Sequence, residues 1–170
     1  DLIVGSADPF QLFRIMDGRK IIVRMLDPPL HEFLPRGSHA ISQLARVANL
    51  SPEVVRQRVD RLRETNPMLG HRGCRLGIDI PELTQMQSRA IARAVRDVRA
   101  EGIEVAVQIM VPLVGHVREL TLQKAVIEAE LDGLEIKIGT MIEVPRAALT
   151  AGEIAGAAAF FSFGTNDLTQ

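Results

Sequence analysis

Short apolar runs recur along this chain and predict strands that are buried on both faces. The run at residues 105–111 is strongly apolar and contains a single polar residue, Gln108, and runs at 136–144 and 159–163 follow it. A β-branched run occupies residues 21–24 near the start of the chain. We expect a further short strand in the glycine-punctuated segment 68–77, with Cys74 and Leu76 as its core.

Apolar stripes at helical spacing fill most of the intervals between these runs. One predicted helix begins at Pro81 and ends at Gly102, and another covers residues 117–131. Residues 9–17 and 147–158 predict two more helices, although glycines weaken the second of them. From residue 68 onward, strands and helices therefore alternate.

This alternation is typical of an α/β fold in which helices cover a parallel sheet. We count five predicted strands, whereas a closed eight-stranded barrel typically takes about 250 residues. The chain has 170 residues, so it is either an open doubly wound sheet or part of a barrel. An incomplete sheet leaves unpaired edges and exposed apolar faces, so we expect a partner such as a second copy in a homodimer.

A helical pair interrupts the pattern at residues 39–64, with Ser51 as the N-cap of its second helix. The stretch 43–64 resembles a helix-turn-helix, which leaves nucleic-acid recognition as an alternative function. Acidic residues dilute its charge, and we interpret the pair as a helical insertion packed beside the sheet. Its arginines would then lie on a solvated face, and they are Arg56, Arg58, Arg61 and Arg63.

Composition narrows the classes of function. The formal net charge is -1, and the chain has neither Trp nor Tyr, so it lacks the features of a general nucleic-acid binder. No apolar run is long enough to span a membrane, and no signal peptide opens the chain. The single cysteine, Cys74, suits a reducing compartment, and we expect a cytoplasmic protein. The sequence around Cys74 lacks the set of His and Asp residues that would activate it as a nucleophile, so we interpret it as a core residue.

Charged residues follow several of the predicted strands. Arg24 and then Asp27 come after the first run, and Arg72 lies in the glycine-punctuated segment. Glu143 lies at the end of the strand at 136–144, and Asp167 follows the last run. The carboxyl ends of parallel strands meet at one edge of the fold, so we expect these side chains to converge.

Such a set of side chains has a specific chemistry. Two carboxylates on different strands suit Mg²⁺, which takes few protein oxygens together with substrate oxygens and water. Guanidinium groups match carboxylate or phosphate oxygens in two-point fashion. Gly164 would let backbone N–H groups approach an anion closely. Each acidic residue alone is explained as well by structure, but together they predict a magnesium site for a small phosphorylated carboxylate.

Four segments carry a resemblance to the pyruvate phosphate dikinase family of phosphoenolpyruvate (PEP)-utilising enzymes, and together they cover nearly the whole chain. The last of them is also similar to PEP synthase and to enzyme I of the sugar phosphotransferase system. The first two look specific to the dikinase. In chain order, the four segments are residues 24–35, 66–76, 139–148 and 160–170.

The resemblance implies the carboxy-terminal PEP/pyruvate-binding (β/α)8 TIM barrel of a multidomain transferase. Such an enzyme converts ATP, pyruvate and phosphate to AMP, PEP and diphosphate, through a phosphohistidine on another domain of the same enzyme. Arg24 and Arg72 would hold the phosphoryl group and stabilise its transfer, and Glu143 and Asp167 would bind Mg²⁺. The substrate's carboxylate and phosphoryl end would be lined by Gly164, Thr165 and Asn166.

The resemblance also implies what this segment lacks. We expect residues 1–170 to be an incomplete barrel domain without the family's first strand, last two strands and proton-donating cysteine. Cys74 does not correspond to that cysteine. The segment would then be inactive by itself. The alternatives are a PEP-binding or regulatory module without catalysis, and a phosphotransferase like PEP synthase or enzyme I.

Overall fold

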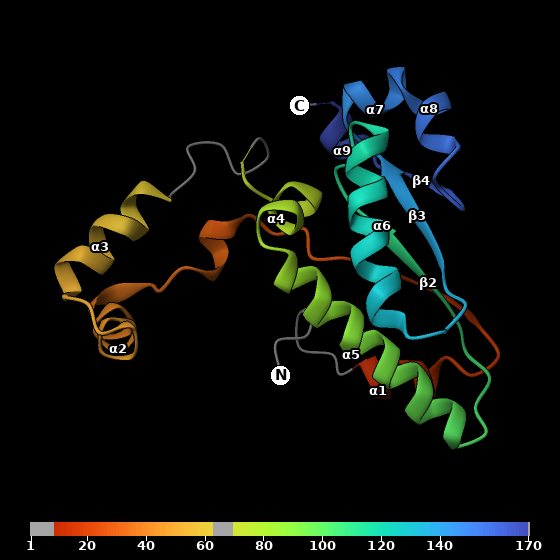
Figure 1. Ribbon diagram of the computed structural model, residues 1–170, viewed down its shortest axis with the longest axis horizontal. Helices are drawn as coiled ribbons and strands as arrows, with labels where there is room; N and C mark the ends of the chain where they lie inside the picture. The colour runs from red at the N-terminus through yellow and green to blue at the C-terminus, as the bar shows by residue number, and fades with distance from the viewer. Residues whose placement is uncertain (1–8, 63–69, 170) are drawn as a thin grey trace. The chain divides into compact units, whose positions relative to one another are not determined.

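The computed structural model of the protein describes residues 9–62 and 70–169. They fall into two compact units (Figure 1). The first unit runs to Asp27 and resumes at Gly73, and the second unit is Pro28–Arg72. The first unit contains α1 (Pro9–Ile15), β1 (Lys20–Arg24), α4 (Gly73–Asp79), α5 (Pro81–Ala100), β2 (Ala106–Val111), α6 (Val117–Leu131), β3 (Lys137–Ile142), α7 (Pro145–Leu149), α8 (Ala151–Ala155), β4 (Phe161–Phe163) and α9 (Thr165–Leu168).

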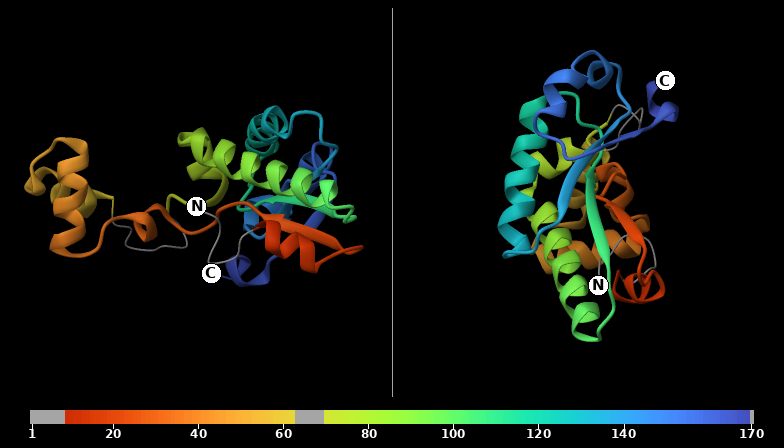
Figure 2. Two further views of the ribbon diagram at one scale, coloured as in Figure 1. Left: turned by 90° about the horizontal axis from the view of Figure 1, so that it is seen from below. Right: turned by 90° about the vertical axis from the view of Figure 1, so that its right-hand side faces the viewer.

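The four strands form one parallel sheet in the order β1-β2-β3-β4, which is also their order along the chain. Arg24 pairs with Met110, and Met110 in turn pairs with Gly139. Helices α5 and α6 lie side by side on one face of this sheet (Figures 1 and 2). A strand order that never reverses is that of a barrel segment, because a doubly wound sheet reverses direction and places helices on both faces. The fold is therefore a partial (β/α) barrel.

The core of this unit lies between the sheet and its helices. Buried side chains of the strands, such as Ile109 and Ile138, meet Val95 and Val98 of α5 and Ile127 of α6 in one apolar cluster. Each fully buried side chain of this kind stabilises the fold by about 1.5–3 kcal/mol. The core explains why the strand runs are apolar on the helix-facing side.

The opposite face of the sheet is filled partly by Phe160, which precedes β4. A Cβ atom on Gly139 would lie 2.6 Å from the Phe160 ring and would also meet the Phe160 carbonyl oxygen. Lys20 Nζ lies 5.9 Å from the centre of the same ring, a cation–π distance. Glycine at 139 thus lets an aromatic ring cross β3 toward β1.

Most predicted elements are present, and one is wrong. The helix at 117–131 has the predicted bounds, and its first turn is held by a capping box in which Glu119 accepts from the N–H of His116. The predicted strand around Cys74 and Leu76 is instead the helix α4. The sheet of the described residues therefore has four strands rather than five. The predicted helix at 147–158 is two short helices, α7 and α8.

The second unit is a helical pair with a small core of its own. It contains the 3-10 helix η1 (Leu30–Phe33), α2 (Gly37–Ala48) and α3 (Pro52–Arg61). Ser51 Oγ accepts a hydrogen bond from the N–H of Val54 at 3.3 Å, so it caps α3 as the sequence predicts. The core of this pair consists of Ile41, Ala45, Val55 and Val59, with Leu34 and Leu50 packed against it.

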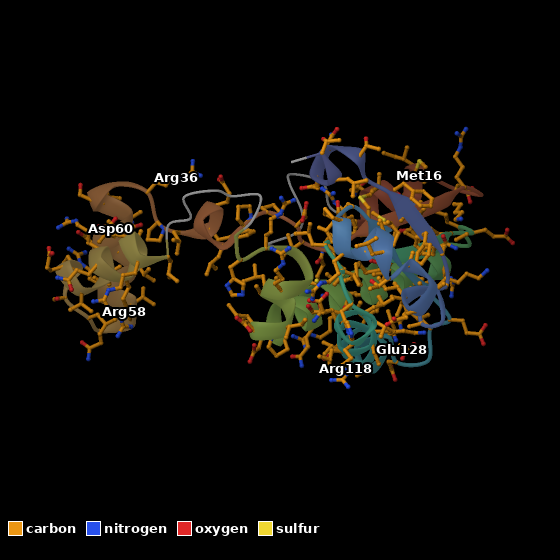
Figure 3. The ribbon with its side chains drawn as sticks, turned by 90° about the horizontal axis from the view of Figure 1, so that it is seen from above. Met16, Arg36, Arg58, Asp60, Arg118 and Glu128 are labelled. Atoms are coloured by element: carbon orange, nitrogen blue, oxygen red, sulfur yellow. The ribbon has the colours of Figure 1, made fainter. Side chains whose placement is uncertain are left out.

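The charges of the second unit are largely exposed. Figure 3 labels Arg58 and Asp60 on α3 and Arg36 ahead of α2. Arg36 forms an ion pair with Glu32, and Arg56 with Glu53 at 2.9 Å. Arg56 is one of the arginines that the nucleic-acid alternative would use, and it already has an acidic partner. Arg63 lies outside the described residues.

Candidate functional site

All four strands of the first unit end at the same edge of the sheet, because they are parallel. Glu143 directly follows β3, and Gly164 directly follows β4. The residues of the predicted site that belong to this unit are Arg24, Glu143, Gly164, Thr165, Asn166 and Asp167. The sheet topology therefore places them at one edge, as expected from the sequence.

Glu143 is the most constrained of these residues, because its side chain is completely buried, with 0% of its surface exposed. Its Oε1 accepts a hydrogen bond of 2.7 Å from the backbone N–H of Leu113, at the end of β2. Its Oε2 has no hydrogen-bond partner among the described residues. A buried carboxylate oxygen without a partner is costly, so this atom is suited to receive a cation or a donor from a ligand.

The donor to Glu143 is itself held in an uncommon conformation. Leu113 has a φ of 60°, in the left-handed region that bulky residues avoid. Such a conformation costs about 1–3 kcal/mol and persists only where the surrounding structure imposes it. Leu113 is buried, so its packing maintains the backbone that carries the N–H to Glu143.

Gly164 contributes space beside Glu143. A Cβ atom at this position would lie 2.9 Å from Glu143 Cβ, 3.1 Å from Glu143 Oε2 and 2.7 Å from Met141 Sδ. The backbone N–H of Gly164 donates to the carbonyl of Ile142 at 3.1 Å. The predicted use of glycine for close approach therefore applies to the neighbouring carboxylate, while its own N–H belongs to the sheet.

Electrostatics link four charged groups of this edge. Burial raises the pKa of Glu143 above its ordinary value, the hydrogen bond from Leu113 opposes this, and the carboxylates of Asp27 and Asp167 raise the pKa further. The guanidinium of Arg24 acts in the opposite direction on the same pKa. Arg24, Asp27 and Asp167 therefore all lie within electrostatic reach of the Glu143 carboxyl group.

Asp27 was expected at the strand-end edge, three residues after the first predicted strand, but it was given no role in binding. The structure buries it, with Oδ2 3.3 Å from Nη2 of Arg24. The available signal was its position shortly after a buried strand, at the edge of the sheet where Glu143 follows β3.

The remaining predicted residues differ in their surroundings. Thr165 and Asn166 are exposed in the first turn of α9, and Asp167 is half-buried. Arg72 is buried and is the last residue of the second unit. Residues 66–69, which belong to the same motif as Arg72, lie outside the described residues.

Cys74 is a core residue, as predicted. It is buried in α4, and desolvation raises the pKa of its thiol to about 12, with the Glu119 carboxylate adding to the effect. A thiol with such a pKa stays protonated at neutral pH and is a poor nucleophile.

A metal ion at this edge would need oxygens beyond the protein's own. Within residues 9–62 and 70–169, no three His, Cys, Asp or Glu side chains group closely enough to hold one. Mg²⁺ commonly binds one or two carboxylates and completes its shell with water and substrate oxygens. The unpartnered Oε2 of Glu143, with Asp167 within electrostatic reach, fits that pattern.

Comparison with known proteins identifies the family. Residues 7–170 match the PEP-binding domain of the PEP-utilising enzymes. The chain belongs to this family. Within it, the chain is 54% identical to pyruvate, phosphate dikinase of Rhizobium meliloti (strain 1021), over 99% of this chain and 20% of that protein.

Plant members of the PEP-utilising family are nearly as similar. The chloroplastic pyruvate, phosphate dikinase of Flaveria pringlei is 52% identical over 94% of this chain and 18% of its own length. Pyruvate, phosphate dikinase 2 of Zea mays is 51% identical over 94% of this chain and 19% of its own length. The chain thus spans about a fifth of the length of these relatives. No helix of the described part is long and apolar enough to cross a membrane.

Proposed function

We propose that this chain is the PEP/pyruvate-binding part of a pyruvate phosphate dikinase, which forms PEP from pyruvate by Mg²⁺-dependent phosphoryl transfer. The observation that carries the proposal is the buried Glu143, whose Oε2 has no partner among the described residues, at the strand-end edge. The high identity to proteins named pyruvate, phosphate dikinase supports the reaction class.

The transfer itself requires few protein atoms. In the direction of PEP formation, the methyl group of pyruvate loses a proton to the cysteine that the family resemblance implies outside this segment, the P–N bond of a phosphohistidine breaks, and a P–O bond forms to the enolate oxygen. When bound, Mg²⁺ supplies positive charge that stabilises the enolate and the phosphoryl oxygens. Phosphoryl transfer depends mainly on positioning and charge neutralisation.

The chain's own residues would divide these tasks. Glu143 and Asp167 would hold the metal. Because they follow two neighbouring strands, β3 and β4, their carboxylates would reach the ion from two different strands. Arg24 and Arg72 would bind the phosphoryl oxygens as bidentate donors. The exposed first turn of α9, with Thr165 and Asn166 after Gly164, would contact the carboxylate end of the substrate.

The proposed partners follow from the same assignment. The phosphohistidine would be carried by another domain of the same enzyme, and ATP and phosphate would be used at a separate ATP-grasp domain. We also propose a homodimer, which is supported by apolar side chains exposed on the edge strands, such as Ile22 at 45% and Phe163 at 74%. A cytoplasmic location remains a prediction from the single cysteine, and some relatives are named chloroplastic.

Calorimetric titration of the chain with Mg²⁺ and oxalate, a planar dianion that mimics the enolate of pyruvate, tests the proposal. We expect oxalate to bind only when Mg²⁺ is present and Glu143→Gln to abolish binding while the protein stays folded. The matched control is Glu128→Gln, which removes a carboxylate from the covering helix α6 rather than from a residue that follows a strand (Figure 3). Oxalate binding that ignores Mg²⁺, or that survives Glu143→Gln unchanged, contradicts the proposal.

A further inference from the structure

Arg24 does not extend freely from the end of β1. Its Nη2 lies 3.3 Å from Oδ2 of Asp27, whose side chain is only 8% exposed, whereas the Arg24 side chain is 45% exposed. An ion pair that is open to solvent on one side adds little to stability. The pair does restrict the Arg24 side chain, which has many rotamers, because one edge of its guanidinium is held by the buried carboxylate of Asp27.

The backbone that joins these two residues is also fixed. The N–H of Met25 donates to the carbonyl of Met110 at 2.9 Å, which extends the pairing of β1 with β2 by one residue. The N–H of Leu26 donates at 2.9 Å to Oε1 of Gln87, a buried side chain of α5. Asp27 is therefore presented from a segment that is tied to both the sheet and a covering helix.

The Arg24–Asp27 pair lies within electrostatic reach of the proposed ligand site. Both charges act on Glu143, in opposite directions. A carboxylate close to an anion site repels the ligand, so Asp27 would weaken binding unless its charge served another purpose. Pairing with Arg24 offsets that repulsion and uses only part of the guanidinium, which has five N–H donors in a rigid fork.

On the basis of the proposed function, we propose that Asp27 is a positioning residue that fixes the Arg24 guanidinium so that its other N–H groups bind the anion beside Glu143. Asp27 would not touch the substrate. Its effect passes through Arg24, and this distinguishes it from a buried acid that only stabilises the fold. The two roles differ in whether the effect of Asp27 persists when Arg24 is absent.

A double-mutant cycle separates these roles, with the affinity for PEP measured by calorimetry at saturating Mg²⁺, because PEP carries the phosphoryl group that Arg24 would bind. We expect Asp27→Asn to weaken PEP binding about tenfold, as coupled neighbours do. In an Arg24→Met background, Asp27→Asn should cause no further loss. The matched control is Asp97→Asn, which removes the acid of an exposed Arg93–Asp97 pair on α5, and PEP should then bind as in the unmutated chain.

Arg24→Lys gives a second measurement that leaves the charge of Asp27 neutralised, so that folding is preserved even if Asp27→Asn is unstable. A lysine ammonium cannot hold Asp27 and present a planar fork to the phosphoryl oxygens, so PEP should again bind about tenfold more weakly. Normal PEP affinity in Arg24→Lys or in Asp27→Asn overturns the inference, as do losses that simply add in the double variant. Absence of oxalate binding in the unmutated chain instead overturns the proposed function, and the inference with it.

Discussion

The hydroxyl of Thr140 on β3 donates a 2.7 Å hydrogen bond to the backbone carbonyl of Val111 at the end of β2. Both residues are buried, and they precede Leu113 and Glu143 along their respective strands. It ties together the two strand ends whose extensions carry the donor and the acceptor of the Leu113–Glu143 hydrogen bond. The spacing of the site thus depends on a side chain that takes no part in binding.

Replacing Thr140 with valine should lower the free energy of unfolding by about 1–2 kcal/mol, because a buried carbonyl loses its donor while the side-chain volume is kept. Urea denaturation followed by circular dichroism measures the change. Thr121→Val is the matched control, since Thr121 donates to the carbonyl of Val117 on the exposed face of α6. It should change stability by less than about 0.5 kcal/mol. Equal losses in the two variants would refute the role given to Thr140.

Gly164→Ala should disrupt the site without a change in charge. The added methyl group would overlap Met141 Sδ and the Glu143 side chain, so we expect a loss of about 1–3 kcal/mol in stability and a loss of Mg²⁺-dependent oxalate binding. Gly152→Ala on α8 is the comparison, because a Cβ atom there meets nothing within 4 Å. Alanine should stabilise that helix by up to about 1 kcal/mol. Thermal unfolding and calorimetry of both variants test this contrast.

The stability of the metal-free protein should fall as the pH rises through the raised pKa of Glu143. The folded state binds this proton more tightly than the unfolded chain, so the contribution is fully present below about pH 4.5, the ordinary glutamate value, and is lost above the raised pKa. Glu143→Gln has no such proton, so its stability relative to the unmutated chain should increase over this window. Added Mg²⁺ should remove the decline, because it binds the ionised carboxylate. Denaturation midpoints measured at several pH values check the sign, and a stability difference that is independent of pH contradicts it.

Cys74 should be unreactive in the folded protein. Its thiol is buried, and its pKa of about 12 leaves almost no thiolate at pH 8. A chromogenic disulfide reagent should modify it only at the rate of unfolding, and rapidly in denaturant. Fast modification under native conditions would show that α4 opens readily and that the desolvation inferred for this site is absent.

The sequence was sufficient for the elements that form long periodic patterns. The helix at 117–131 and the strand at 105–111 are set by local periodicity and by burial on both faces, so their positions could be predicted. The segment around Cys74 could not. Residues 73–79 are too few to separate a period of two from a period of 3.6, and α4 buries Cys74 and Leu76 as a strand would. Only packing against α5 and α6 distinguishes the two.

The candidate site was predictable to a similar extent. Parallel topology alone brought Glu143 and Gly164 to one edge of the sheet. The hydrogen bond from Leu113 depends on a left-handed backbone at a leucine, which no sequence pattern signals. The backbone that precedes Asp27 is held by a hydrogen bond from the N–H of Leu26 to Gln87, which is far away in the chain. Long-range contacts of this kind decide which of several charged residues are held and which remain exposed.

The consecutive order of the strands has a consequence for the folding kinetics. The pair β2–β3 is joined through α6, and the pair β3–β4 through α7 and α8. By contrast, the connection from β1 to β2 consists of residues 25–105 and includes the whole helical pair. The entropy of closing a loop grows only slowly with its length, so this long connection costs little in equilibrium stability. It does raise contact order, which slows folding. We therefore expect β2, β3 and β4 to become ordered first, and Arg24 and Asp27 to reach their places when β1 docks.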